Sequence, residues 1–125
     1  ILPSCSFPTF ADSIGAMYHC SCNYVPGLLL YGESADVLGL IAPRPLVIVS
    51  GNADEIFPLE PAIRQFARLR EIYAAAGAPG HCRHVIASGG HRFYAEDSWK
   101  AMLPFWNEEE NPRRSETVFG KDIPS

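Results

Sequence analysis

The chain has 125 residues, of which 47% are apolar and 19% are charged, and this balance favours one globular domain over a disordered chain. Its net charge of −4 gives no sign of the basic surface that nucleic acids or anionic membranes require. Every apolar run is far too short to span a bilayer. We therefore expect neither a nucleic-acid partner nor a membrane partner, and four cysteines are too few for a disulfide framework.

The chain opens with the apolar stretch "ILPSCSF", which we interpret as the end of a strand. It starts at Ile1 rather than at a methionine, so we expect the natural protein to begin upstream. An apolar strand at the edge of a sheet invites pairing with other chains. Further strands are therefore expected before Ile1, in a missing N-terminal segment or in a partner chain.

A short helix is predicted over residues 10 to about 18. Thr9 and Asp12 have the spacing of a capping box, and three apolar residues then fall on one helical face: Phe10, Ile14 and Met17. Residues 19–34 are rich in turn residues and are expected to form a packed excursion. Residues 35–45 are predicted to make one or two helical turns that end at prolines.

A buried strand is predicted at residues 46–51, "LVIVSG". The stretch is almost entirely apolar and shows no alternation, which is typical of a parallel strand covered by helices on both faces. The clearest helix follows within residues 58–77, where apolar residues recur at steps of four and three. Gly77 and Pro79 are the stop signal of this helix.

A last strand and a last helix are predicted near the C-terminus. Residues 82–88, "CRHVIAS", form the strand, and residues 96–106 form the helix, which Pro104 bends or ends. We expect one face of this helix to be buried: Trp99, Met102 or Leu103, and Trp106. The polar residues 107–125 are predicted to form a solvated tail outside the domain of residues 1–106.

The alternation of strands and helices predicts the fold class. The order strand, helix, strand, helix, strand, helix indicates an α/β fold with about three parallel strands, right-handed crossovers and flanking helices. Functional sites of such sheets form beyond the carboxyl ends of the strands. The loops after residues 46–51 and 82–88 are therefore the places to search for chemistry.

Asp54 and His91 are the candidate catalytic residues. Each follows a predicted strand, and on neighbouring strands Asp54 could accept a hydrogen bond from one ring nitrogen of His91, leaving the other nitrogen as a base. Taken singly, an acidic residue after a strand is often a turn former, and a loop histidine is often structural. Their order along the chain, acid and then histidine, is that of α/β-hydrolases, in which the serine comes first.

The sequence resembles a known family of hydrolases. "CNYVPGLLLYGESADVLGLIAPRPLVIVSGNADEIFP" together with "GGHRFY" is similar to the C-terminal part of bacterial α/β-hydrolases of the dienelactone hydrolase and acetyl xylan esterase type. The resemblance covers about residues 1–106 and implies the C-terminal portion of that fold, with the N-terminal strands missing. It places Asp54 as the triad acid and His91 as the triad histidine, with Glu55 as the fallback acid.

The nucleophile of this family has no clear counterpart in the chain. The elbow G-x-S-x-G is absent, and the nearest match is "GESAD", which lacks the last glycine and follows no β-branched strand. Ser34 is therefore a weak candidate. We expect a fragment that carries the acid and the histidine but cannot act alone as a serine hydrolase.

A metal site is a rival interpretation of the cysteines and histidines. "HCSC" and "HCRH" offer four soft ligands for zinc: Cys20, Cys22, Cys82 and His84. Their one-residue spacing is tighter than usual, and free cysteines are often buried as small apolar residues. Cys5 as a nucleophile beside His91 is a further alternative, but its strand is expected to end elsewhere in the sheet.

The favoured function is that of a serine esterase acting on a small-molecule or carbohydrate ester without a cofactor. A different class is the alternative: a non-catalytic α/β module that assembles through its open sheet edge, for example with a second copy. In the first case, the missing N-terminal part of the fold is the partner that this chain requires.

Overall fold

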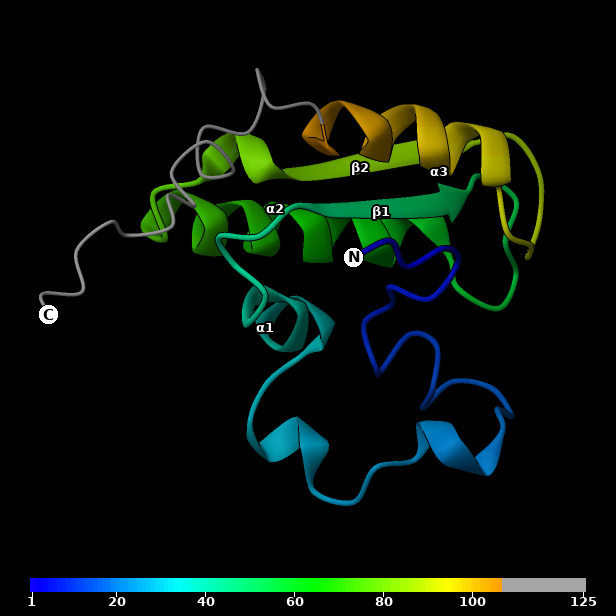
Figure 1. Ribbon diagram of the computed structural model, residues 1–125. Helices are drawn as coiled ribbons and strands as arrows, with labels where there is room; N and C mark the ends of the chain where they lie inside the picture. The colour runs from blue at the N-terminus through cyan, green and yellow to red at the C-terminus, as the bar shows by residue number, and fades with distance from the viewer. Residues whose placement is uncertain (107–125) are drawn as a thin grey trace, which may run out of the picture.

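The computed structural model describes residues 1–106 (Figure 1), and the predicted tail 107–125 lies outside them. The sheet consists of β1 (Leu46–Gly51) and β2 (Cys82–Ala87), and the α-helices are α1 (Ser34–Gly39), α2 (Leu59–Ala75) and α3 (Ala95–Met102). Short 3-10 helices complete the description: η1 (Ser21–Asn23), η2 (Leu28–Leu30), η3 (Pro79–His81) and η4 (Leu103–Trp106). The chain belongs to the α/β class, and among the described residues no helix is both long and apolar enough for a membrane span.

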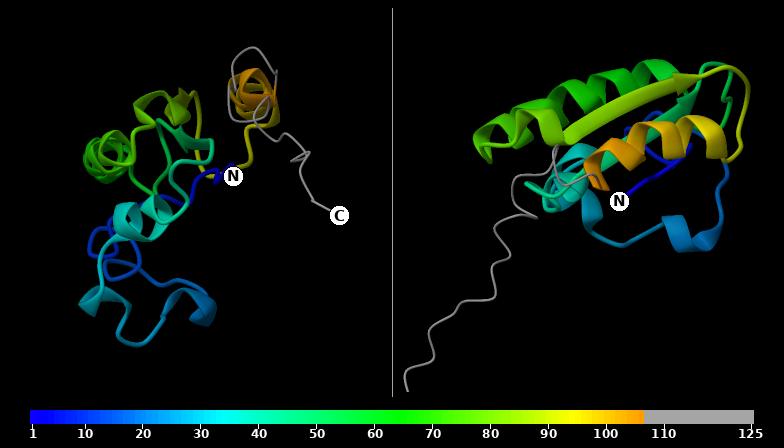
Figure 2. Two further views of the ribbon diagram at one scale, coloured as in Figure 1. Left: turned by 60° about the vertical axis from the view of Figure 1, so that its left-hand side comes forward. Right: turned by 45° about the horizontal axis from the view of Figure 1, so that its top comes forward.

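The two strands are parallel, and their register brings their carboxyl ends level. Leu46 pairs with Cys82 at one end and Gly51 with Ala87 at the other. All six residues of β1 are buried, which confirms the prediction of a strand covered on both faces. Figure 2 shows why, because α2 lies on one face of the sheet and α3 on the other.

Each face of the sheet has its own core. Alternate β1 side chains point to opposite faces. Leu46 and Ile48 pack with Leu69 and Tyr73 of α2, whereas Val47 and Val49 belong to the cluster on the side of α3. Helix α2 ends as predicted, because Gly77 adopts a φ of 71° and allows Ala78 N–H to donate to Tyr73 O at 2.9 Å.

The prediction of about three strands is wrong for the described residues, whose sheet has two. Residues 1–5 run beside β1 and share three backbone hydrogen bonds with Val47 and Val49, but they form a single isolated parallel bridge, between Ser4 and Val49. Pro3 has no N–H to donate, and Cys5 has a φ of 50°, which turns the chain out of the extended conformation. The segment therefore follows the strand without forming a ladder.

The predicted helix at residues 10–18 is also absent, and turns take its place. Gly15 N–H donates to Phe10 O, five residues back, and the N–H groups of Ala16 and Met17 both donate to Ser13 O. Thr9 and Asp12 do bond each other, as their spacing indicated. Such local side-chain bonds compete with helical ones, and a short segment has few bonds to propagate a helix.

The buried face of the last helix differs from the prediction at both tryptophans. Met102 and Phe105 are buried, whereas Trp99 and Trp106 are 45% and 51% exposed. The chain changes from α3 to the 3-10 helix η4 at Leu103, next to Pro104, and this alters the angular step between residues. The change of step brings Phe105 inward, and the two tryptophan rings lie against each other at the surface, with centroids 5.8 Å apart.

Candidate active site

Two loops meet beyond the carboxyl ends of β1 and β2 (Figure 1). The backbone joins them at several points: Asn52 N–H donates to Ala87 O at 2.9 Å, and Ala53 N–H donates to Gly89 O at 2.9 Å. The side-chain oxygen of Asn52 in turn accepts from Gly89 N–H at 2.9 Å. The first loop carries Asp54 and the second carries His91, so the level strand ends bring both to one edge.

Asp54 and His91 form a hydrogen bond in this arrangement. Nδ1 of His91 lies 3.0 Å from Oδ2 of Asp54. The side chain of Asp54 is fully buried, while that of His91 is 44% exposed. An ionised carboxylate can only accept, so Nδ1 carries the proton and Nε2 is left as the basic nitrogen. Their catalytic role stays a prediction.

The carboxylate of Asp54 is held from several sides. Its Oδ1 accepts from the N–H groups of Ile56 and Phe57, both at 2.9 Å. Burial by itself raises the pKa of Asp54, but the N–H of Phe57, the ring of His91, the thiol of Cys5 and the N–H of Ile56 more than offset it. The net pKa lies below its ordinary value, so the group stays ionised at neutral pH.

Phe57 fixes the plane of the His91 ring. The two rings are stacked, with centroids 5.4 Å apart and an angle of 21° between their planes. Because Phe57 N–H also donates to Asp54, one residue orients both members of the pair. Phe57 was not among the residues predicted for the site, although its place three residues after the acid suits a side chain over the histidine.

Close packing explains the glycines around the site. A Cβ at Gly51 would lie 2.5 Å from Gly89 O and 2.7 Å from Gly90 O, both of them backbone atoms. The histidine loop therefore passes directly over the end of β1. Tyr94 closes the same loop from the other end, since its hydroxyl donates to Gly90 O at 2.6 Å.

A buried pair of side chains, Ser13 and His19, supports the acid loop, and no sequence pattern predicted it. The Ser13 hydroxyl donates to Ile56 O at 2.6 Å and lies 3.1 Å from Nε2 of His19. The His19 ring contacts the edge of Phe57, with centroids 5.4 Å apart. Because the hydroxyl proton of Ser13 goes to a carbonyl, this serine is a support for the loop and not an activated nucleophile. No sequence signal joins Ser13 to Ile56, 43 positions away.

The other residues that the sequence suggested for catalysis do not lie beside His91. Glu55 is exposed, and Asp54 alone takes the position beside His91. Ser34 lies in the first turn of α1, a helix set away from the loop that carries His91 (Figure 1). Among the described residues, no serine hydroxyl forms a hydrogen bond with His91.

The predicted zinc ligands are not brought together. Cys20 and Cys22 are exposed at η1, whereas Cys82 is buried in β2, and none of them is disulfide-bonded. His84 pairs instead with the hydroxyl of Ser50, at 2.9 Å, and burial lowers its pKa. These residues do not gather into a metal-binding group within residues 1–106.

Cys5 is the unexpected neighbour of the pair. Its strand was expected to end elsewhere in the sheet, but the opening segment lies directly beside β1, and Cys5 N–H donates to Val49 O at 2.8 Å. This places the thiol within 4.8 Å of a carboxylate oxygen of Asp54, where it helps to lower the pKa of that group. Cys5 is only 3% exposed, so a substrate cannot reach it as a nucleophile.

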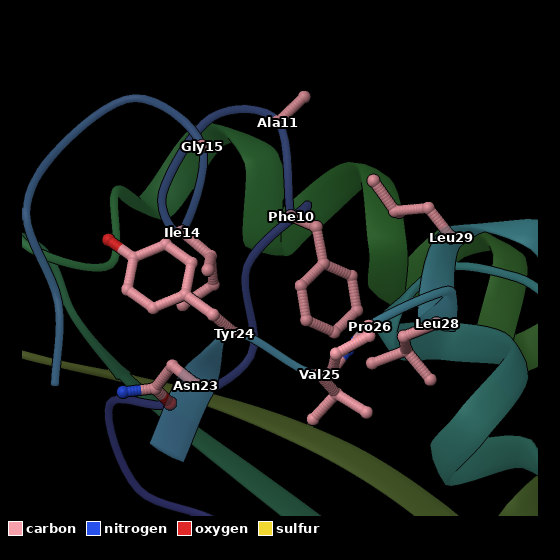
Figure 3. A pocket seen from close by; sticks show the side chains of 10 residues that line it. All are labelled: Phe10, Ala11, Ile14, Gly15, Asn23, Tyr24, Val25, Pro26, Leu28 and Leu29. Atoms are coloured by element: carbon pink, nitrogen blue, oxygen red, sulfur yellow. The ribbon is translucent and has the colours of Figure 1, made fainter. Parts of the chain in front are cut away.

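A separate apolar hollow lies within the excursion. Its volume is about 370 Å³, and Figure 3 shows the rings of Phe10 and Tyr24 around it together with Ile14, Val25 and Leu28. The lining is almost entirely apolar, so the hollow suits an apolar group rather than a charged one.

The comparisons with known proteins point to a hydrolase. The chain is 34% identical over 68 residues to the protein named "Putative hydrolase YtaP" of Bacillus subtilis (strain 168), a match that covers 54% of this chain and 23% of the relative. The chain thus spans about a quarter of the length of the relative that it matches. No family model matches the chain, and no solved structure does. The similarity indicates a relationship to a hydrolase and names no substrate.

Proposed function

We propose that Asp54 and His91 are the acid and the base of a serine hydrolase that acts on carboxylic esters, of the acetyl xylan esterase and dienelactone hydrolase type. One observation carries the proposal: a fully buried carboxylate lies 3.0 Å from Nδ1 of an imidazole that is itself 44% exposed. This is the arrangement that leaves Nε2 of a histidine ready to take a proton from a nucleophile. The similarity to a hydrolase supports it.

The reaction follows from these roles. The serine oxygen attacks the acyl carbon while Nε2 of His91 takes the hydroxyl proton, and Asp54 stabilises the imidazolium that forms. The intermediate collapses as His91 gives the proton to the leaving alkoxide, and an acyl-enzyme remains. Water then attacks with the same base, and the products are a carboxylic acid and the free serine. No step requires a cofactor.

In this proposal, the serine nucleophile is supplied by residues outside this sequence. Among the described residues no serine bonds His91, and the match covers about a quarter of the relative. A longer protein that contains this chain, or a companion chain, would present the serine at the exposed side of His91. The substrate would be a small-molecule or carbohydrate ester, bound between both parts.

A fluorophosphonate probe tests the proposal, because it labels only an activated serine. The purified protein is treated with the probe, and intact masses are measured. We expect an adduct on a larger or companion chain and none on the 13.7 kDa chain itself. His91→Gln should slow the labelling by roughly 1,000-fold or more, because the serine then has no base.

Glu55→Gln is the matched control, because Glu55 is adjacent to Asp54 but exposed. It should leave labelling unchanged, whereas Asp54→Asn should reduce it strongly. No adduct on the folded longer protein or on a companion chain, or labelling that His91→Gln does not slow, contradicts the proposal. Absence of labelling together with a size that depends on concentration would favour the alternative, a non-catalytic module that assembles through its sheet edge.

A further inference from the structure

Three potential metal ligands converge at the candidate active site. The thiol of Cys5, a carboxylate oxygen of Asp54 and a ring nitrogen of His91 all lie within 4.8 Å of one another. They come from three segments: the opening residues, the loop after β1 and the loop after β2. Such a convergence is a property of the tertiary structure and not of any sequence spacing.

The distances suit a small cation. Zinc binds sulfur at about 2.3 Å and nitrogen or oxygen at about 2.0–2.2 Å, so the ligand atoms of a tetrahedral site lie roughly 3–4 Å apart. His91 and Asp54 already meet this spacing at 3.0 Å. The thiol lies within 4.8 Å of both atoms, so a shift of at most about 1–2 Å would complete the set, and rotation about χ1 can move a cysteine sulfur this far.

The identity of the ligands selects the metal. Thiolate, imidazole and carboxylate together are a zinc set, whereas magnesium and calcium require oxygen ligands. Three protein ligands leave a fourth position for water or another small ligand. With thiolate and carboxylate both charged, the two negative charges balance Zn²⁺ in a largely buried place.

The surroundings orient two of the ligands. Oδ1 of Asp54 is held by the N–H groups of Ile56 and Phe57, which leaves Oδ2 to face the other ligands. Cys5 is kept at a φ of 50° by its bond to Val49 O. Residues other than glycine occupy this region at a cost, and such strain is concentrated where a side chain must be presented in one direction.

We propose that Cys5, Asp54 and His91 form a Zn²⁺ site that competes with the Asp54–His91 hydrogen bond. Zinc enters from the exposed side of His91; the thiol releases its proton to solvent, and the ring proton moves from Nδ1 to Nε2, so that Nδ1 can bind the metal. The metal-bound imidazole can no longer donate to Asp54, so zinc would inhibit the esterase; this consequence rests on the proposed function, whereas the binding does not.

Cobalt is the direct probe, because a cobalt–thiolate bond gives a charge-transfer band in the near ultraviolet. The exposed cysteines are first removed in a Cys20→Ser/Cys22→Ser background, so that the thiols that remain are Cys5 and Cys82. We expect a band that saturates at one equivalent of cobalt and disappears when zinc is added. Cys5→Ser should abolish the band, and the matched control Cys82→Ser, also at a buried cysteine, should keep it.

His91→Gln provides a second test at an exposed position, where folding is least disturbed. It should weaken zinc binding, measured by calorimetry, at least about tenfold, since even outer partners of a metal site contribute roughly 10- to 100-fold. Circular dichroism checks that each variant is folded. A folded background protein without a cobalt–thiolate band, or a band that persists in Cys5→Ser, overturns the site.

The two proposals fail separately. Labelling with fluorophosphonate is measured in the presence of a chelator, and zinc binding is measured without the probe. If zinc binds but no serine is labelled, the site stands and the esterase does not. If labelling depends on His91 but zinc neither binds nor slows it, the esterase stands and the metal site is wrong.

Discussion

The sheet with its helices and the excursion of residues 8–32 are stabilised in different ways. In the first, side chains of β1, β2, α2 and α3 bury one another on both faces of the sheet. In the second, large apolar side chains face solvent, and Tyr18, Leu30 and Tyr31 are 86–95% exposed. The packed excursion was expected over residues 19–34, and the exposure of Leu30 and Tyr31 contradicts that expectation. Burial determines the shape of the sheet region, whereas a few contacts determine that of the excursion.

Some of those contacts lead to α1 and α2, where Phe10 N–H donates to Glu33 and Asp12 pairs with Arg64, and others lead to the candidate site. Ser13 and His19 are buried, and they reach the carbonyl of Ile56 and the ring of Phe57. The excursion thus supports the loop that holds Asp54, although most of its own surface is open. A segment can therefore hold a site in place through a few hydrogen bonds and ring contacts, even though it buries little apolar surface of its own.

The largest effect is expected from core truncation, compared between the two regions. Leu69→Ala removes a fully buried side chain of α2 and should lower the free energy of unfolding by about 2–5 kcal/mol. Leu30→Ala removes the same atoms at 86% exposure and should change it by less than about 0.5 kcal/mol. Urea unfolding measures both. Similar losses at the two positions would show that the excursion is packed after all.

Asp54→Asn tests the electrostatics of the site. Since hydrogen bonds to charged groups each contribute about 1.5–3 kcal/mol, the variant should lose stability on that scale at neutral pH. The pKa of Asp54 is depressed in the folded state, so its contribution is complete above the ordinary value of 3.8 and is lost as the pH falls through the lower folded value. Unfolding measured from neutral to acid pH should show the two proteins converging in acid. A constant difference, or one equalled by Glu55→Gln, would contradict the assignment.

Gly51→Ala examines the close approach of the two loops. The added methyl group meets two carbonyl oxygens of the histidine loop at 2.5 and 2.7 Å, so we expect a loss of about 1–3 kcal/mol and a displaced His91. Gly80→Ala is the control, because nothing lies within 4 Å of its methyl group. Thermal unfolding and the NMR signals of the His91 ring report the change. Equal behaviour of the two variants would mean that the loops are farther apart.

Tyrosine-to-phenylalanine changes compare the two regions with the smallest expected loss of stability, because each removes a single hydroxyl group. Tyr73 is fully buried and its hydroxyl donates to Arg44 O at 2.8 Å, so Tyr73→Phe should cost about 0.5–1.5 kcal/mol. Burial also raises the pKa of Tyr73 to about 12, so its hydroxyl stabilises the fold below the ordinary value of 10 and ceases to do so as the pH rises toward 12. Tyr24→Phe in the excursion should cost less, because Tyr24 is 48% exposed and water can replace its hydroxyl. Chemical unfolding of both variants shows which of the two loses more stability.

Local patterns predicted the elements that bury a continuous apolar face. The apolar run of β1 and the steps of four and three in α2 repeat over enough residues for periodicity to be decisive. The meeting of Asp54 and His91 was predicted for a topological reason, because parallel neighbours bring their carboxyl ends to one edge. The proposed catalytic pair follows from that rule and not from any local motif.

Short or polar segments were predicted less well. Residues 10–17 have helical spacing, but so few residues form too few backbone bonds to outweigh the bonds of Thr9, Asp12 and Ser13. Trp99 and Trp106 were expected on the buried face of the last helix together with Met102 or Leu103, but the buried side chains are Met102 and Phe105. The change to a 3-10 helix beside Pro104 brings Phe105, rather than Trp106, to the cluster on this face of the sheet.

The sequence by itself determined the α/β class, the buried strand β1, the helix α2 and the positions of an acid and a histidine after successive strands. These depend on periodicity and on chain order, which are local. Only the tertiary structure decided that Cys5 lies against Asp54, that Ser13 bonds Ile56 and that the opening segment forms a bridge rather than a strand. Each of these contacts joins residues more than 40 positions apart, and where such residues meet depends on the packing of everything between them.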